Sequence, residues 1–308
     1  MAVGERVAAF GYIAGWKIVG RLPRGLARRI FDAGADKASD DGRGMEQLRR
    51  NLSRVVGAEH VTRELVRDAM RSYARYWREA FQLPAIAGDR ELMRQLDKSV
   101  DGREHLDAAI AKGKGVVLTL PHSGNWDMAG MWLVQRYGQF TTVAERLKPE
   151  ELFDAFVNFR ESLGFNVIAL TGGDTPPYEQ LRGVLEAGGI VCLLGERDFG
   201  GRGVPVTFFG EQTTFPAGPA KLAVDTGAEL MVAHSWFKEF EGDAAQPGWG
   251  FSVSPPIEVT TVEATAQRIA NGFAENIAAH PADWHMLQPL WPADIQWRRS
   301  LPRRREVK

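Results

Sequence analysis

The chain has 308 residues, with 38 Lys and Arg against 39 Asp and Glu, so its formal charge is −1 at neutral pH. This balance excludes a strongly basic nucleic-acid-binding protein, and a hydrophobic content of 44% excludes an acidic disordered chain. The charges are unevenly distributed, because residues 1–30 and 298–308 each hold six basic side chains and one acidic side chain. The residues between these ends carry a net charge of −11, so two basic ends flank an acidic body.

Cysteine content and hydropathy exclude further classes of protein. The chain has one cysteine, Cys192, which rules out an intramolecular disulfide framework and fits a reducing compartment. Because Cys192 lies in the apolar run 190–194, it is predicted to be a buried core thiol. No stretch of about eighteen apolar residues is present, and Lys17 interrupts the first apolar segment, so we expect neither a membrane-spanning helix nor a secretory signal.

The first thirty residues have the composition of a segment that lies on a membrane. Residues 7–19 are apolar and partly aromatic, and four arginines follow within residues 20–29. Residues 1–30 are therefore predicted to form an amphipathic, membrane-facing segment with its cations near anionic head groups, helped by the basic tail 298–308. The alternatives are a helix that packs on the body of the protein and a solvated tail.

The remainder of the first hundred residues is predicted to be mainly helical. Apolar residues recur at spacings of three and four in residues 45–56, 62–81 and 89–96. Pro84 is expected to end the second of these helices.

From Gly115 onward, short apolar runs rich in β-branched residues alternate with longer helical patterns. This alternation predicts βαβ units, and the fold class is therefore α/β, with a central, mostly parallel sheet flanked by helices and an N-terminal helical layer. The predicted strands are residues 116–120, 141–144, 166–170, 190–194, 206–209, 230–237 and 250–253, and the predicted helices include 149–163, 216–226 and 263–280.

An aromatic segment over residues 284–297 closes the chain. Its tryptophans, Trp284, Trp291 and Trp297, are predicted either to anchor at the bilayer interface or to pack against the domain. No internal repeat and no linker rich in Gly, Ser or Pro divides the chain, so a single domain is expected over residues 1–308.

The sharpest motif is the run LPHSGNWD over residues 120–127, directly after the predicted strand 116–120. Sites in parallel α/β sheets gather at the carboxyl ends of strands. His122 and Asp127 are five residues apart and would not share a face of one helix, so His122 is expected in a turn and Asp127 about one turn inside the next helix. A histidine held by a carboxylate is suited to deprotonating a hydroxyl. Alternatively, Asp127 only caps the helix and His122 is a hydrogen-bonded surface residue.

Ser123 follows the histidine but is not expected to be the nucleophile. Neighbouring side chains diverge in a strand or turn, and the chain contains no Gly-x-Ser-x-Gly elbow. The histidine is therefore expected to activate an external hydroxyl.

Two further charged features, elsewhere in the sequence, are candidates for a functional site. Residues Glu196, Arg197 and Asp198 follow the predicted strand 190–194, where a functional site is favoured over a solvated loop. Arg160 lies on the apolar face of the predicted helix 149–163, where an unpaired guanidinium would be costly to bury. Its expected partner is Glu145, Glu196 or a substrate phosphate, unless its side chain reaches solvent from the edge of that face.

Apolar and histidine side chains elsewhere give weaker signals. Residues 202–215 contain Val204, Val206, Phe208, Phe209 and Phe215, which are predicted to line an acyl-chain tunnel or to pack in the core. The remaining histidines lack metal-ligand spacing, so no metal site is predicted.

These motifs resemble the lipid A late-acyltransferase family of membrane acyltransferases, and within it the actinobacterial branch that acylates phosphatidylinositol mannosides. The resemblance runs from about Gly11 to Trp291. It is carried by residues 121–127, 142–150, 159–164, 196–198 and 208–210, with support for the branch from residues 72–81, 216–223 and 281–289.

The resemblance implies transfer of a fatty acyl group, palmitoyl above all, from acyl-CoA as co-substrate to a mannose hydroxyl of a phosphatidylinositol mannoside. It implies a peripheral enzyme on an anionic membrane surface, at the cytoplasmic face of the plasma membrane, with no cofactor, no metal and no nucleic-acid partner. His122 would be the general base, with Glu196, or alternatively Asp127, as the carboxylate that orients it. The substrate-binding residues would be Glu145, Arg160, Arg197, Ser123 and Asn125, with Arg197 on a phosphate of the lipid or of CoA.

Three alternatives remain at this point. An acyltransferase of the same family could act on another, lipid A-like glycolipid. A lipid esterase or thioesterase would use the same histidine with water as the acceptor. A non-catalytic membrane adaptor would account for the basic ends but would leave the two motifs at strand ends unexplained.

Overall fold

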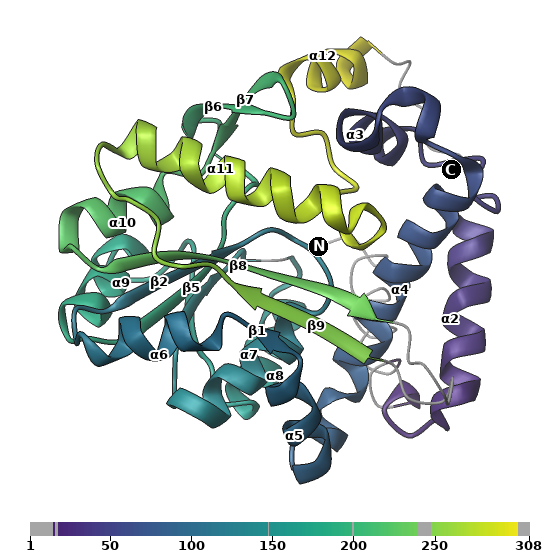
Figure 1. Cartoon of the computed structure of the whole chain (residues 1–308). Helices are drawn as coiled ribbons and strands as arrows, with labels where there is room; N and C mark the ends of the chain where they lie inside the picture. Colours follow the sequence, from purple (N-terminus) through teal and green to yellow (C-terminus); the bar gives the residue numbers. More distant parts are fainter. Residues whose placement is uncertain (1–14, 16–17, 147, 199, 239–247, 301–308) are drawn as a thin grey trace.

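A seven-stranded sheet runs through the centre of the computed structural model, which describes residues 15, 18–146, 148–198, 200–238 and 248–300 (Figure 1). The strand order is β1-β9-β8-β2-β5-β3-β4, and every neighbouring pair is parallel except β8 and β9. The predicted α/β class with a mostly parallel sheet is therefore confirmed. The strands are β1 (Val100–Asp101), β2 (Val116–Leu120), β3 (Thr141–Ala144), β4 (Asn166–Ala169), β5 (Ile190–Leu194), β8 (Glu229–Lys238) and β9 (Gly248–Val253).

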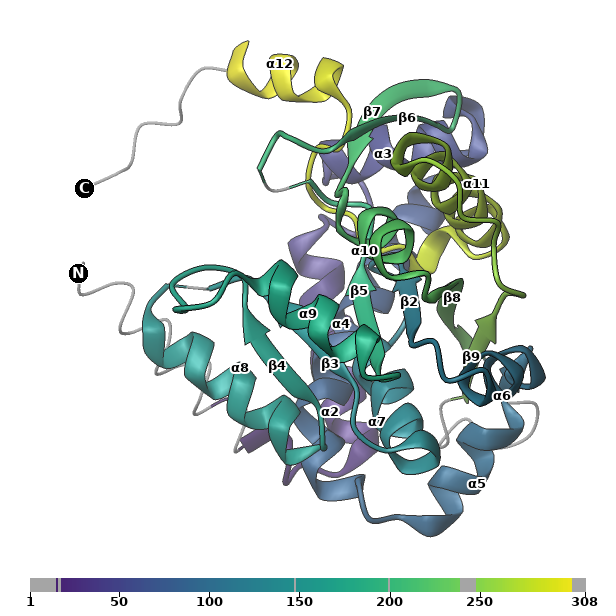
Figure 2. The same cartoon turned by 90° about the vertical axis from the view of Figure 1, so that its left-hand side faces the viewer.

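Helices cover both faces of this sheet, because the strands are apolar on both sides and must be buried on both (Figure 2). One face packs against α9 (Pro177–Glu186), α10 (Gly218–Thr226) and α11 (Val262–Ala279). The other face packs against α5 (Arg90–Lys98), α6 (Arg103–Ala111), α7 (Trp126–Tyr137) and α8 (Glu150–Ser162). The site described below lies on the second face, under the N-terminal end of α7.

The predicted N-terminal helical layer is present at one side of the sheet (Figure 1). It consists of α2 (Arg24–Ala38), α3 (Glu46–Val56) and α4 (Arg63–Ile86), which share a small apolar core of their own. The long helix α4 packs along α2 and reaches the start of α7. No helix in the described part of the chain combines the length and the apolar character needed to cross a bilayer.

Two local predictions are corrected. Helix α4 continues through Pro84 to Ile86, because a proline this close to a helix end removes only one hydrogen bond of the last turn. The predicted strand 206–209 is β6 (Val204–Phe208), which pairs with a missed strand, β7 (Glu211–Phe215), in a hairpin outside the central sheet.

The chain ends are described in part. Of the predicted segment 1–30, residues 1–14, 16 and 17 lie outside the described residues, as do residues 301–308 of the basic tail. Trp284 and Trp291 are fully buried, so packing in the domain is correct for both and an interfacial anchor is wrong. The last helix, α12 (Pro292–Ser300), is described only as backbone from residue 297, so the side chain of Trp297 lies outside the description.

Candidate active site

The sheet brings His122 and Glu196 together. β2 and β5 are parallel neighbours in which Leu120 lies opposite Leu194, so His122 and Glu196 each lie two residues beyond a matched pair. His122 Nδ1 is 2.9 Å from Glu196 Oε1, and the His122 backbone N–H donates to the same oxygen at 2.6 Å. Glu196 is fully buried, whereas 19% of the His122 side chain is exposed. Nδ1 therefore lies at ion-pair distance from a buried carboxylate, which is anchored by the His122 backbone N–H, and part of the imidazole is open to solvent.

A segment far along the chain fixes the turn that carries His122. The His285 backbone N–H donates to the His122 carbonyl at 2.7 Å, and the Gly124 N–H donates to the Asp283 carbonyl at 3.0 Å. Gly124 has a φ of +56°, and a Cβ there would lie 2.5 Å from the Ser235 backbone, so only glycine fits. The turn is thus built between β8 and the 283–285 segment.

Ser123 and Asn125 are both fully buried. Ser123 Oγ lies 3.0 Å from His234 Nδ1. Asn125 is the N-cap of α7, where its Oδ1 accepts from the Met128 N–H, and its Nδ2 donates to Glu79 at 2.8 Å. These hydrogen bonds assign both side chains to the support of the turn, and direct substrate contact by either one stays a prediction.

Asp127 lies in the first turn of α7, as predicted, but its carboxylate does not approach His122. It accepts from Arg160 Nε at 2.8 Å and from the Tyr76 hydroxyl at 2.9 Å. The expected partners of Arg160, Glu145 and Glu196, are therefore wrong, because the guanidinium pairs with Asp127. This ion pair raises the pKa of Arg160 against the opposing effect of burial, and it ties α7 to α8 and α4.

The remaining predicted residues lie at the open edge of the site. Glu145 follows the carboxyl end of β3 and is exposed, and Arg197 is half-buried in the loop after β5. The next residue, Asp198, accepts from the Gly203 N–H at 2.7 Å and from the Thr214 hydroxyl, and these hydrogen bonds stabilise the loop that contains it. Glu145 and Arg197 remain predicted substrate contacts.

His122 differs from two nearby histidines. Burial lowers the pKa of His234 to about 3 and that of His285 to about 3, so both imidazoles are neutral at neutral pH. His234 and His285 are almost fully enclosed. Of these three imidazoles, His122 is the one whose side chain is partly exposed, so it is the one that a hydroxyl of a bound substrate can reach.

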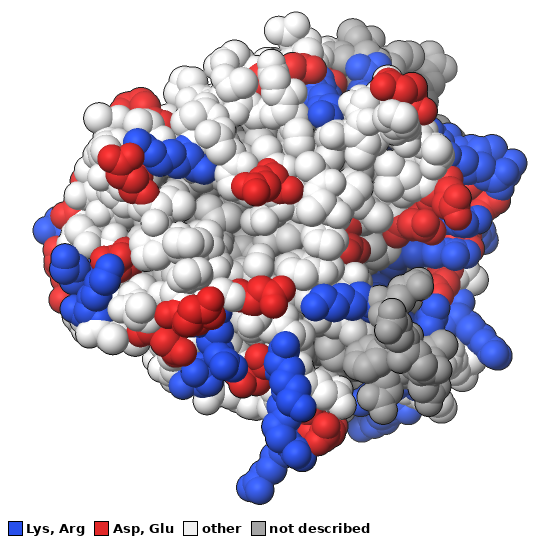
Figure 3. Space-filling view, in the orientation of Figure 1, with Lys and Arg blue, Asp and Glu red and all other residues white. Residues whose placement is uncertain are grey.

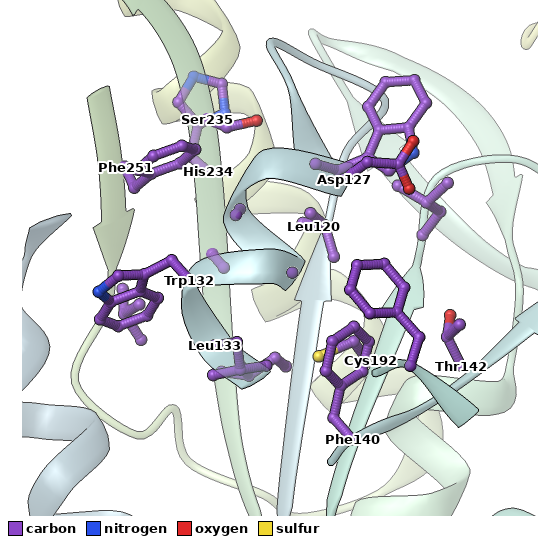
Figure 4. A pocket seen from close by; sticks show the side chains of 18 of the residues that line it. Leu120, Asp127, Trp132, Leu133, Phe140, Thr142, Cys192, His234, Ser235 and Phe251 are labelled. Carbon is purple, nitrogen blue, oxygen red and sulfur yellow. The ribbon is translucent and has the colours of Figure 1, made fainter. Parts of the chain in front are cut away.

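An apolar cavity lies between α7 and the sheet, and its lining includes Trp126, whose ring lies 5.7 Å from the His122 imidazole (Figure 4). Leu120 and Asp127 lie at the end near the strand termini, and Leu133 and Phe140 lie at the opposite end. Cys192 lines its wall, and burial raises the pKa of this thiol, as expected for an unreactive core residue.

An acyl-chain tunnel over residues 202–215 is one of two predictions for that region. The side chains of the β6–β7 hairpin pack in the core against α11, so the alternative core prediction for residues 204–215 is correct. The actual cavity is signalled by Ala129 and Gly130, two small residues that line it on an otherwise bulky helix. A Cβ at Gly130 would approach Phe165 to 2.5 Å.

Comparison with known proteins agrees with this geometry. The family model described as bacterial lipid A biosynthesis acyltransferase matches residues 3–293. The phosphatidylinositol mannoside acyltransferase of Mycobacterium tuberculosis (strain ATCC 25618 / H37Rv) is 54% identical over 298 residues, covering 96% of this chain and 92% of the relative. The phosphatidylinositol mannoside acyltransferase of Mycolicibacterium smegmatis (strain ATCC 700084 / mc(2)155) is 54% identical over 297 residues, covering 95% and 94%. This chain therefore belongs to the bacterial lipid A biosynthesis acyltransferase family.

Proposed function

We propose that the protein transfers a fatty acyl group, palmitoyl above all, from acyl-CoA to a mannose hydroxyl of a phosphatidylinositol mannoside. The observation that carries this proposal is a partly exposed imidazole, 2.9 Å from a buried carboxylate, next to the indole of Trp126, which lines an apolar cavity. The names of the two relatives support the choice of acceptor.

The two parts of the site fit the two substrates. The cavity has a mostly apolar lining between α7 and the sheet, where an alkyl chain is favoured by about 0.8 kcal/mol for each buried methylene. His122 stands at the carboxyl ends of β2 and β5, where polar head groups can approach from solvent. The thioester carbonyl would therefore lie between the cavity and His122.

The reaction follows as a direct transfer. His122 Nε2 accepts the proton of the mannose hydroxyl while its oxygen attacks the thioester carbonyl carbon, and Glu196 stabilises the imidazolium that forms. The C–O bond forms, the C–S bond breaks, and the proton passes from His122 to the departing CoA thiolate. No covalent intermediate on the protein is required.

The test is product analysis with purified full-length protein, a mixed acyl-CoA pool and a series of mannosylated phosphatidylinositols. We expect acylated lipid that depends on the acceptor, with palmitoyl enriched over shorter chains, as measured by mass spectrometry. Release of free fatty acid alone would assign the protein to the thioesterases and overturn the proposal. Acylation of a lipid A-like glycolipid in preference to the mannosides would overturn the choice of acceptor.

We further propose that the protein docks on anionic lipid at the cytoplasmic face of the membrane through α2. Leu26 and Ile30 on this helix are 48% and 51% exposed, and Ile18 before it is 60% exposed. Arginines of the same helix lie among them, and in Figure 3 the edge where Figure 1 places α2 shows Lys and Arg side chains interspersed with Asp and Glu. Exposed aliphatic side chains beside cations are the pattern of an interfacial helix.

Association with anionic vesicles is expected to weaken as ionic strength rises, because counterions screen the arginines over about 10 Å at 0.1 M salt. The double variant Leu26→Ser/Ile30→Ser should weaken binding further in a vesicle flotation assay. Leu170→Ser is the matched control, since Leu170 is an exposed aliphatic side chain outside α2. Binding that is indifferent to both salt and the double variant would refute docking through this helix.

A further inference from the structure

A buried N–H group beside His122 has no hydrogen-bond acceptor among the described residues. It is Nε1 of Trp126, the first residue of α7. The indole stacks on Tyr76, with ring centroids 3.9 Å apart and planes at 29°, and meets the His122 imidazole nearly at right angles at 5.7 Å. Because buried donors are almost always paired in folded proteins, an unpaired one held this rigidly beside a candidate base calls for an explanation.

The position of the indole suggests what it serves. Trp126 lines the apolar cavity at its His122 end. If the acyl chain occupies the cavity and His122 activates the attacking hydroxyl, the thioester carbonyl lies between the two, next to this N–H. This step rests on the proposed function.

Two other polar side chains that line the cavity are already engaged. Arg160 donates to Asp127, and Ser235 Oγ donates to the Ser123 carbonyl at 2.5 Å. His234 Nε2 also lacks a partner, but its ring stacks between β8 and α11, with centroids 5.6 Å from Trp236 and 5.7 Å from His280. Trp126, by contrast, directly follows the turn that carries His122.

We propose that Trp126 is a catalytic residue whose indole N–H donates a hydrogen bond to the thioester carbonyl oxygen as it becomes an oxyanion. When the acceptor oxygen bonds to the carbonyl carbon, the π-electron pair moves to this oxygen and receives the hydrogen bond. When the C–S bond breaks, the pair returns and the CoA thiolate leaves with the proton held by His122. The indole keeps its own proton throughout, so it stabilises charge and transfers nothing.

The test replaces the N–H and keeps an aromatic ring, in the variant Trp126→Phe. Loss of one oxyanion donor lowers kcat by about 10²-fold. The KM for acyl-CoA and the melting temperature should change little, since the ring can still stack on Tyr76. A purely structural role would instead lower the melting temperature or raise KM.

Trp291→Phe is the control. Its indole is also fully buried, but it packs in the opposite core, stacked on Phe208 and donating to the Phe208 carbonyl at 3.3 Å, away from the turn that carries His122. Its kcat is expected to stay within a few-fold of the parent. A Trp126→Phe enzyme with kcat within threefold of the parent, or equal losses in both variants, would overturn the assignment.

Two further measurements keep the test decisive. If Trp126→Phe does not fold, incorporation of 3-benzothienylalanine at position 126 replaces the N–H by sulfur in a ring of the same shape, and the same loss of kcat is expected. Hydrolysis of acyl-CoA without any lipid acceptor separates the two proposals, because the donor acts on the thioester carbonyl whatever attacks it. A parent that cleaves acyl-CoA but acylates no mannoside would disprove the proposed acceptor while still allowing the Trp126 effect to be measured.

Discussion

Replacing His122 by alanine is expected to lower kcat for acyl transfer by about 10²–10⁴-fold, the usual contribution of a general base. The hydroxyl of a sugar is a weak nucleophile, and within the described site the other two imidazoles near the turn are buried and neutral. Fatty acid binding should remain, because the cavity is lined by other residues. The measurement is the initial rate of acylated lipid formation at saturating acyl-CoA.

His60→Ala is the matched control for this experiment. His60 is largely exposed on the short 3-10 helix Ala58–His60, beside Glu59, and its loss should leave the rate unchanged. Transfer within a few-fold of the parent in His122→Ala would remove the histidine from the mechanism and leave the site as a binding surface.

From the sequence, His122 and Glu196 could each be placed at the end of a strand, but their contact with each other could not be predicted. The runs 116–120 and 190–194 are recovered as β2 and β5 with their predicted bounds, because continuous β-branched segments between helices are typical of buried parallel strands. Their adjacency depends on a strand order in which β5 is inserted between β2 and β3. Strand order is set by packing across the whole domain, so no local pattern around His122 or Glu196 encodes it.

Partner choice among charged side chains was the least predictable feature. Arg160 was correctly expected to need an anion on its apolar face, yet the anion is Asp127, the residue first considered for His122. Rotation of α7 decides this, because Asp127 on its first turn faces α8 and Tyr76 of α4, away from the turn. A spacing of five residues limits the distance between the backbones of His122 and Asp127, but it does not determine which neighbouring helix each side chain contacts.

The cavity could not be predicted from composition for a related reason. Apolar residues of the β6–β7 hairpin and of α7 look alike in sequence, but the first set meets α11 and fills its own space. Ala129 and Gly130 are two of the α7 residues that line the cavity, and the space beside Gly130 is taken by Phe165, which would lie 2.5 Å from a Cβ there. A cavity forms where two packed elements do not fill the space between them, and the sequence of either element alone does not show how the two fit together.

The two substitutions Glu196→Ala and Glu196→Gln are expected to separate the two tasks of the buried carboxylate. Glu196→Ala removes both the hydrogen-bond acceptor and the charge, and its loss of kcat should approach that of His122→Ala. In serine hydrolases, an amide in place of the carboxylate costs about 10⁴-fold because it favours the wrong imidazole tautomer. Here the His122 backbone N–H donates to the same oxygen that faces Nδ1, so a glutamine amide is held with its oxygen in that place. Glu196→Gln should therefore keep the tautomer and lose only the charge that stabilises the imidazolium, a loss of about ten- to a hundredfold.

The double variant His122→Ala/Glu196→Ala decides whether the pair acts as a unit. If Glu196 works only through His122, its removal costs nothing further once the imidazole is gone, and the double variant should have the rate of His122→Ala within a few-fold. Multiplicative losses would mean that Glu196 contacts the substrate directly. Because Glu196 is fully buried and bonded to the backbone of residue 122, loss of stability must be measured in parallel by thermal unfolding. A small change in melting temperature together with non-multiplicative rates would identify Glu196 as the residue that positions the base. Equal losses of kcat in Glu196→Gln and Glu196→Ala would instead show that the reaction requires the charge of Glu196 and not its geometry.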